Sequence, residues 1–558
     1  MSSAHSVPLT LSSRAEHVFP TLTPEQIARI AVHGRPRAVR TGEVLVTAGQ
    51  HPDTFFVVTA GSIELVRDGE HGEELVGVQK AGQFTGEISM LSGRRSLINL
   101  RAPEDGGVIE VTRDDLLALV QNDSELSDIL MRAFILRRVE LIAHGFGDVV
   151  LLGSPFCTGT LRVKEFLARN GHPYTFVDLE RDSGVQELLD RFRIGPEDVP
   201  VLICRGKVVL RRPTNLEIAT CLGFNEGIDQ ERVRDIVIIG AGPAGLAAAV
   251  YGASEGLDVL LLETEAPGGQ AGSSSKIENY LGFPTGISGQ ELAGRAITQA
   301  EKFGAEMLVA QSATQLLCER RPYVLEVNED TRVSARTVVI ATGARYRKLE
   351  IEDLARFEGA GVYYGATPIE SQLCRDEEVI VVGGGNSAGQ AAVFLAQAAA
   401  RVHMLVRGDG LAETMSRYLI RRIEQSPAIV LRPHTEIVAL EGLRHLERVR
   451  WRDNDTGSVT AHEIRHVFTM TGAVPSTAWL DGCVPLDENG FIKTGPDLTK
   501  EDLARAGWPL PRPPHLLETT LPGVFAVGDV RRGNVKRVAS AVGEGSIAVT
   551  FVHAVLAE

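Results

Sequence analysis

Glycines and a carboxylate between residues 236 and 263 have the spacing needed to hold a pyrophosphate and a ribose. The apolar run 236–239 leads into Gly-Ala-Gly-Pro-Ala-Gly at 240–245, and an alanine-rich segment follows. In a strand–turn–helix unit, such glycines make the turn, let the backbone approach phosphates and allow close helix packing. The next apolar run, 259–262, ends in a carboxylate that can accept hydrogen bonds from ribose hydroxyls. We predict a dinucleotide site at Gly240, Gly242, Pro243, Ala244, Gly245 and Glu263; a glycine-rich turn of another α/β fold is the alternative.

A second unit of the same kind begins near residue 378. The apolar run 379–382 leads into Gly-Gly-Gly-Asn-Ser-Ala at 383–388, and the following run, 402–406, ends in an arginine rather than an acid. An arginine at this place suits the 2′-phosphate of NADPH, whereas a solvated arginine beside an NADH site is the other interpretation. The predicted residues are Gly383, Gly385, Asn386, Ser387, Ala388 and Arg407.

Two dinucleotide units, the second inserted in the first, resemble the flavoprotein reductases, and further motifs resemble thioredoxin reductase. They are Pro-Gly-Gly-Gln at 267–270 with Glu-Asn-Tyr at 278–280, Ala-Thr-Gly-Ala at 341–344, and Gly-Val-Phe-Ala-Val-Gly-Asp at 523–529. The resemblance implies FAD on the first unit, NADPH on the second, hydride transfer between them, and a homodimer. The FAD site would then also include Gly269, Gln270, Asn279, Gly343, Gly528 and Asp529.

The chain departs from thioredoxin reductases at their redox centre. Those enzymes carry Cys-x-x-Cys shortly before the second glycine motif, but residues 364–370 read Tyr-Gly-Ala-Thr-Pro-Ile-Glu. Cys374 stands alone nearby, and we expect it to be a small buried side chain. The resemblance implies electron flow from NADPH through flavin to a disulfide or a thioredoxin-like acceptor. A reductase of ferredoxin, quinone or another non-disulfide acceptor, and a ligand-gated redox sensor with little turnover, are the alternatives.

Residues 147–226 show a strand and helix order that resembles thioredoxin and glutaredoxin, β-α-β-α-β-β-α, with its second helix over 185–192. Ser-Pro-Phe-Cys at 154–157 lies between the first strand and helix, and Val199-Pro200 resembles the cis-proline turn of those families. A thiolate at a helix N-terminus is stabilised by the helix dipole, so Cys157 is the candidate catalytic thiol. Thr160 stands where a second cysteine would be, and an inert thiol on a scaffold domain is the alternative.

Residues 82–96 resemble the phosphate-binding cassette of cyclic nucleotide-binding domains. In that family a glutamate accepts from the ribose, an arginine pairs with the cyclic phosphate and the next hydroxyl assists. The matching residues are Gly86, Glu87, Arg95 and Ser96. Apolar runs at 55–58 and 63–66 predict a hairpin within a small antiparallel barrel bracketed by helices. A domain that has lost its ligand and serves packing is the alternative.

These units divide the 558 residues into a cyclic nucleotide-binding-like domain (20–145), a thioredoxin-like domain (147–226), an FAD-binding domain in two parts (233–350 and 483–558) and an NADPH-binding domain (351–482). The fold class is therefore multidomain, with a β-barrel, an α/β domain and two nested Rossmann-like domains. A net charge of −15 argues against nucleic acid as a partner. The sequence contains no run of ~18 apolar residues, so we expect no membrane span. Six cysteines without Cys-x-x-Cys favour a reducing cytoplasm over a disulfide scaffold.

Overall fold

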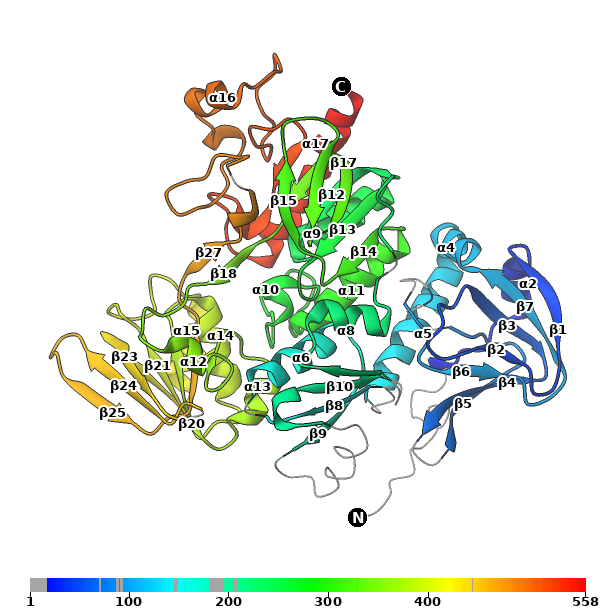
Figure 1. The fold of residues 1–558 in the computed structure, drawn as a ribbon, viewed down its shortest axis with the longest axis horizontal. Coiled ribbons are helices and arrows are strands. Elements are labelled where there is room, and N and C mark those ends of the chain that lie inside the picture. The colour runs from blue at the N-terminus through cyan, green and yellow to red at the C-terminus, as the bar shows by residue number, and fades with distance from the viewer. Residues whose placement is uncertain are drawn as a thin grey trace.

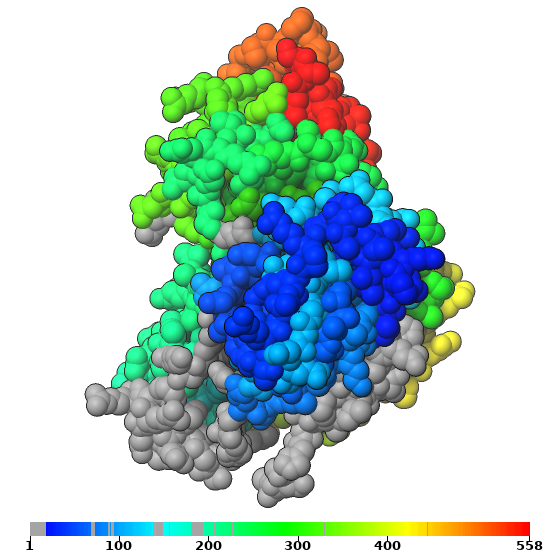
Figure 2. Space-filling model, turned by 90° about the vertical axis from the view of Figure 1, so that its right-hand side faces the viewer, coloured from blue at the N-terminus to red at the C-terminus, as the bar shows by residue number. Residues whose placement is uncertain are grey.

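The computed structural model describes residues 18–69, 72–86, 90, 94–143, 149–155, 157–179, 194–204, 208–225, 227–328, 330–443, 445–480 and 482–558. Figure 1 shows four parts, which we call the N-terminal domain (20–145), the middle domain (147–226), the first lobe (233–350 and 483–558) and the second lobe (351–482). The middle domain lies at the centre of the lower half of the view, between the N-terminal domain and the second lobe. Figure 2 shows the face covered by the N-terminal domain, with the first lobe above it.

The N-terminal domain is built from two antiparallel sheets with strand orders β1-β7-β3 and β2-β6-β4-β5. The rings of Phe55, Phe84 and Phe134 meet in its core at centroid distances of 5.7 and 6.2 Å. The predicted hairpin is wrong: β3 pairs with β7, and β4 pairs with β5 and β6. The apolar pattern predicted both strands but not the strands they pair with, because the turn between them carries the chain from one sheet to the other. The elements are α2 (Pro24–Ala31), β1 (Gly34–Val39), β2 (Val44–Val46), β3 (Thr54–Ala60), β4 (Ser62–Gly69), β5 (Gly72–Lys80), β6 (Asn99–Arg101), β7 (Gly106–Thr112), α4 (Arg113–Asn122) and α5 (Ser124–Ala143).

The middle domain contains one four-stranded sheet in the order β11-β10-β8-β9. β9 runs parallel to β8, and β10 runs antiparallel to both β8 and β11. The Val199–Pro200 peptide bond is cis, as predicted. The helix predicted over 185–192 lies outside the described residues. The elements are β8 (Val149–Gly153), α6 (Thr158–Arg169), β9 (Thr175–Asp178), the 3-10 helix η2 (Pro196–Asp198), β10 (Val201–Cys204), β11 (Val208–Arg211) and α8 (Asn215–Leu222).

The first lobe has a parallel sheet, β14-β13-β12-β17, to which β28 adds from the end of the chain. Its strands are continuous apolar runs because both faces of the sheet are buried: α9, α11 and α17 pack on one face, and β15, β16 and the segment around Leu480 and Ile492 cover the other. Strands β16 and β15 extend the sheet in antiparallel fashion. The elements are β12 (Val233–Ile239), α9 (Pro243–Ser254), β13 (Val259–Glu263), α10 (Gly269–Gly272), α11 (Gly289–Lys302), β14 (Glu306–Val309), β15 (Ala313–Leu317), β16 (Tyr323–Val327), β17 (Thr331–Ile340), η4 (Gly495–Asp497), α16 (Lys500–Ala506), β28 (Val524–Ala526), η5 (Gly528–Val530) and α17 (Val538–Ala557).

Helix α17 is the one helix among the described residues that is long and apolar enough to cross a membrane. Its side chains Ala548, Val549 and Val552 are fully buried in the core that also contains α9 and β12. Packing in the first lobe therefore accounts for the apolar composition of this helix.

The second lobe has its own parallel sheet, β19-β26-β20-β21-β22, and an antiparallel sheet, β23-β24-β25. The chain enters through β18 and leaves through β27, which pair with each other before the chain returns to the first lobe. The elements of the second lobe, with the connecting strand β18 that precedes it, are β18 (Ala344–Tyr346), α12 (Leu354–Phe357), β19 (Val362–Tyr363), α13 (Pro368–Leu373), β20 (Glu378–Val382), α14 (Asn386–Leu395), β21 (Arg401–Leu405), α15 (Arg417–Gln425), β22 (Ile429–Arg432), β23 (Thr435–Glu441), β24 (Arg448–Asp453), β25 (Val459–His462), β26 (His466–Thr469), β27 (Ala473–Pro475) and η3 (Ala478–Leu480).

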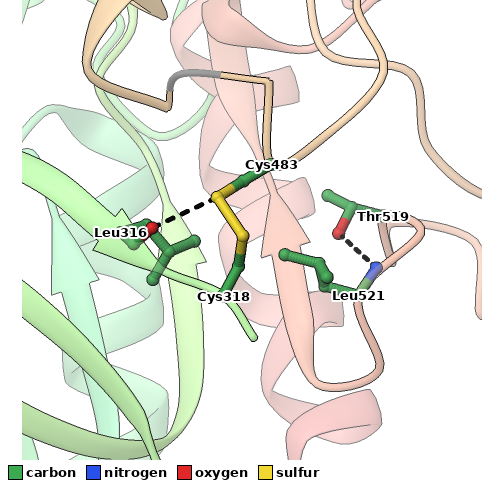
Figure 3. The surroundings of a disulfide bond; sticks show 5 residues. All are labelled: Leu316, Cys318, Cys483, Thr519 and Leu521. Carbon is green, nitrogen blue, oxygen red and sulfur yellow. Dashed lines mark hydrogen bonds between the residues drawn. A yellow bond between two sulfur atoms is a disulfide. The ribbon is translucent and has the colours of Figure 1, made fainter. Parts of the chain in front are cut away.

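A disulfide joins Cys318 to Cys483, across 165 positions of the sequence. Figure 3 shows the bond beside the carbonyl oxygen of Leu316, which lies 3.1 Å from the Cys483 sulfur; nearby, the Leu521 amide donates to the hydroxyl of Thr519. The cysteine spacing did not predict this pair. Spacing along the chain reveals a local Cys-x-x-Cys motif, but it cannot show that two distant cysteines meet in space.

Candidate functional site

The first glycine turn, between β12 and α9, is held by backbone contacts that leave no room for side chains. Gly240 has φ +102°, and a Cβ there would lie closer than 3.0 Å to the Ala341 carbonyl. A Cβ on Gly245 would lie closer than 3.0 Å to the Gly240 carbonyl, so the third glycine is needed for helix–strand packing. A Cβ on Gly528 would meet Ala244 at 3.0 Å, which places the C-terminal motif against the start of α9.

Two carboxylates border this turn. The side chain of Glu263, at the end of β13, accepts from the amides of Ala241 at 2.7 Å and Glu265 at 2.9 Å. Burial raises the pKa of Glu263 and also that of Asp529. A carboxylate at the strand end can accept from a ribose, and the amides at the N-terminus of α9 can face a pyrophosphate. The residues predicted for FAD from this turn therefore fit that group.

The second glycine turn, between β20 and α14, is similar but ends in open space. Gly383 has φ +136°, and its Cβ position would meet the Met470 carbonyl at 2.6 Å, whereas no atom lies within 4 Å of the Cβ position of Gly385. Asn386 accepts from the Ser416 amide at 2.8 Å, and Ala388 is fully buried. The start of α14 thus presents bare backbone to a ligand.

Exposed arginines surround the end of β21. Arg407 follows this strand, and Arg417 and Arg421 lie on α15; all three are exposed. None has a hydrogen bond or ion pair with another described residue. Ser387, also predicted for this site, lies beside the Tyr346 hydroxyl, to which it is hydrogen-bonded. Free guanidinium groups beside an open glycine turn fit the 2′-phosphate of NADPH.

The residues predicted to approach the flavin lie on the loop that contains α10. Gln270 and Asn279 are exposed, and a Cβ on Gly269 would meet the Gly242 Cα at 2.9 Å. No atom lies within 4 Å of the Cβ position of Gly343, at the link between the lobes. Glu278, next to Asn279, forms an ion pair with Arg422 of α15, which connects this loop to the second lobe.

Cys157 is the N-cap residue of α6 and is half-buried. A Cβ on Gly159 would lie 3.7 Å from the Cys157 sulfur and 2.9 Å from Pro200, so this glycine lets the thiol approach the cis-proline turn. Thr160 is fully buried against Gly153, and its hydroxyl has no hydrogen-bond partner among the described residues. The predicted thiol site is therefore assembled, with a buried threonine in place of a second cysteine.

Helix α6 packs on the segment of the second lobe where thioredoxin reductases carry their dithiol. The Thr158 hydroxyl donates to the Glu358 carbonyl at 2.9 Å, and Leu161 shares a buried cluster with Tyr363, Ala366 and Cys374. Figure 1 shows α6 and α13 as neighbours. Burial raises the pKa of Cys374 to about 12, as expected of an inert thiol.

Sequence reasoning missed a pair of carboxyl groups at this contact. Glu165 on α6 is hydrogen-bonded to Glu370 on α13, which is only 2% exposed. Burial, followed by the nearby charge of Glu370, raises the pKa of Glu165 to about 8. Two carboxyl groups can meet in this way only when one of them holds a proton. In the sequence, Glu370 shows only the pattern of a helix cap, which it also is.

The N-terminal domain holds a mostly apolar cavity that Gly86 and Ser96 line. Arg137 of α5 enters this cavity and donates to the carbonyls of Gly86 at 2.7 Å and Val18 at 2.8 Å. Glu87 lies outside the described residues. Arg95, predicted to meet a phosphate, instead donates to the Cys221 carbonyl of the middle domain at 3.4 Å.

Comparisons with known proteins agree with this geometry. Residues 234–545 match the family described as pyridine nucleotide-disulphide oxidoreductase, and residues 36–123 match the cyclic nucleotide-binding domain. Thioredoxin reductase of Ureaplasma parvum is 32% identical over 322 residues, which cover 58% of this chain and 96% of that protein. The Mycolicibacterium smegmatis enzyme is also 32% identical, with 59% and 98% covered. The crystal structure of thioredoxin reductase from T. acidophilum matches with a TM-score of 0.52 at 28% identity, covering 59% of this chain and all of that one.

The chain therefore belongs to the pyridine nucleotide-disulphide oxidoreductases. Within that family it is an FAD-containing, NADPH-dependent oxidoreductase of thioredoxin-reductase type, to which a cyclic nucleotide-binding domain is joined at the N-terminal side. The family resemblance predicted from the sequence is confirmed.

Proposed function

We propose that this reductase passes electrons from NADPH to a disulfide in which Cys157 takes part. The acceptor is then a thioredoxin-like protein or a small disulfide, as the names of the relatives suggest. One observation carries the proposal: α6, which has Cys157 at its start, packs on the segment that lacks the family's dithiol. The strand order of the middle domain and its cis-proline turn support a thioredoxin-like fold for this domain.

When bound, FAD accepts a hydride from NADPH and supplies two electrons to the acceptor. Cys157 attacks the acceptor disulfide and releases one partner thiol, which leaves a mixed disulfide between Cys157 and the other partner sulfur. Two electrons and two protons then break this S–S bond, so that the second partner thiol leaves and the Cys157 thiol is restored. The chain's own residues prepare this step. Cys157 lies at the start of α6, and Gly159 and Pro200 shape the surface on which the partner sulfur is presented.

Turnover of a small disulfide by Cys157→Ser tests the proposal, with Cys221→Ser, a half-buried thiol on α8, as the matched control. We expect Cys157→Ser to lose disulfide turnover while NADPH still bleaches the flavin under anaerobic conditions. Equal disulfide turnover by both variants and the wild type would contradict the role of Cys157. Turnover of quinones or ferredoxin, without any turnover of disulfides by the wild type, would favour the non-disulfide reductase instead.

We further propose that the N-terminal domain binds a cyclic nucleotide. The cavity lined by Gly86 and Ser96 supports this, as does the matching family. A rise in melting temperature with saturating cAMP or cGMP is the expected result. No stabilisation by either nucleotide would favour a domain that serves only packing.

We also infer a homodimer, supported by a groove along α9, α11 and the start of α17. Leu281 is 92% exposed and Tyr251 is 45% exposed at this groove, and apolar surface of this kind marks interaction sites. Light scattering should give a dimer mass for the wild type and a monomer mass for Leu281→Asp; a monomeric wild type would contradict the inference.

A further inference from the structure

Two consecutive arginines of the N-terminal domain reach into the middle domain at the ends of two different helices. The Arg94 guanidinium donates to the Asn170 carbonyl, at the C-cap of α6, at 2.9 Å, and it lies 4.9 Å from the centre of the Phe224 ring. The Arg95 guanidinium donates to the Cys221 carbonyl in the last turn of α8 at 3.4 Å. The last carbonyls of a helix lack intrahelical partners and carry partial negative charge, so both contacts are favourable.

Gly223, the residue after α8, leaves room for the Arg95 side chain. Gly223 ends this helix in the left-handed conformation, with φ +64°. A Cβ at this position would lie closer than 3.0 Å to three atoms of the Arg95 side chain. The bare backbone of Gly223 therefore forms the surface on which the Arg95 side chain rests.

Arg95 lies next to residues that line the cavity of its own domain, although its own side chain does not line it. Ser96, the next residue, lines that cavity, and the Arg95 Nε lies 3.4 Å from His51, whose neighbour Pro52 lines it too. Arg95 thus lies between residues that line the cavity and the end of α8.

We propose that the Arg95 side chain contacts either the phosphate of a cyclic nucleotide in the N-terminal cavity or the end of α8, but not both at the same time. This rests on the proposed nucleotide binding. A phosphate carries a full negative charge and the end of a helix about half of one, so a bound nucleotide draws Arg95 away from α8. Nucleotide binding then loosens the middle domain, and docking of that domain weakens nucleotide binding by the same factor.

The test compares two glycines that end helices in the same way. Gly223→Asn keeps a residue that tolerates the left-handed conformation, but its side chain displaces Arg95 from α8. Gly507→Asn is the matched control, because Gly507 also caps a helix with φ +65° and has no atom within 4 Å of its Cβ position. We measure the Kd of the full-length protein for cAMP and for cGMP.

Gly223→Asn should bind the nucleotide roughly 2- to 5-fold more tightly than the wild type, which corresponds to the typical free energy of a cation at the end of a helix. Gly507→Asn should bind with the wild-type Kd. In the wild type, saturating nucleotide should speed hydrogen exchange in the last turns of α6 and α8, a readout that needs no variant. Equal Kd values for Gly223→Asn and the wild type, or unchanged exchange, would overturn the shared role of Arg95 while leaving nucleotide binding intact. Absence of binding to every form would overturn both.

Discussion

The carboxyl pair between Glu165 and Glu370 makes the docking of the middle domain on the second lobe dependent on pH. Three charged groups face the Glu165 carboxyl: Glu370 on α13, Arg169 on its own helix and Glu265 after β13. Burial and the two glutamates raise the pKa of Glu165, and Arg169 opposes them only in part. The docked form therefore holds a proton on Glu165 that the separated form would lose at neutral pH.

The sign and size of the effect follow from this pKa. Because the docked pKa of about 8 lies above the ordinary value of 4.5, the stabilisation is complete below pH 4.5 and is lost as the pH rises toward 8. Each pH unit in this window costs about 1.4 kcal/mol. The whole span amounts to roughly 5 kcal/mol, an upper limit because Glu165 stays partly exposed.

Glu165→Gln tests this reasoning, because an amide can donate to Glu370 at any pH. We expect the melting temperature of Glu165→Gln to equal that of the wild type at pH 4 and to exceed it at pH 8, by roughly 2–4 °C for each kcal/mol gained. Calorimetry across this range measures the difference, with Glu424→Gln, an exposed glutamate on α15, as the control. Parallel pH curves for Glu165→Gln and the wild type would refute the argument.

Three further changes have defined outcomes. Arg407→Ala should raise the KM for NADPH roughly tenfold and leave the KM for NADH unchanged, because only NADPH carries the phosphate; an equal rise for both cofactors would place Arg407 elsewhere. Thr160→Cys should create a Cys-x-x-Cys pair at the start of α6 and raise small-disulfide turnover severalfold, whereas Thr160→Ser should not; equal rates would show that the pair cannot form. Reducing agent should lower the melting temperature of the wild type but not that of Cys318→Ser, with an entropic upper limit of about 5 kcal/mol for the loop closed with Cys483; an unchanged wild type would show that the bond stabilises nothing.

The glycine turns could be predicted from the sequence because their signals are local. Around 240–245 and 383–388, the strand, the turn and the helix follow one another within 22 and 18 residues, and the ligand is expected at the end of each apolar run. The cis-proline turn at Val199-Pro200 and the position of Cys157 at a helix start are equally local features.

Contacts between distant segments left no such signal. Cys318 and Cys483 show nothing in their spacing that pairs them. The sequence Thr-Pro-Ile-Glu at 367–370 is typical of a helix start, and Glu370 does cap α13. Its contact with Glu165, however, depends on how two domains pack. Arg95 matches a phosphate-binding motif, yet its observed partner is a carbonyl of another domain.

Helix α6 connects the N-terminal domain, the thiol and the flavin loop, and this arrangement limits what regulation can change. Its start holds Cys157, its end receives Arg94, and Arg169 in its last turn donates to the carbonyls of Ala266 and Gly269. A helix about 18 Å long moves as one rigid element, so a shift at its end also moves the thiol.

Among the described residues, no hydrogen bond or ion pair joins α6 to the NADPH turn; the two meet only in an apolar cluster, through Leu161 of α6 and Ala388 of α14. Saturating cyclic nucleotide should therefore change the rate of disulfide reduction and leave the anaerobic rate of flavin reduction by NADPH unchanged. Stopped-flow absorbance separates the two steps. A nucleotide effect on flavin reduction of the same size as on disulfide turnover would show that the signal reaches the lobes by a route other than α6.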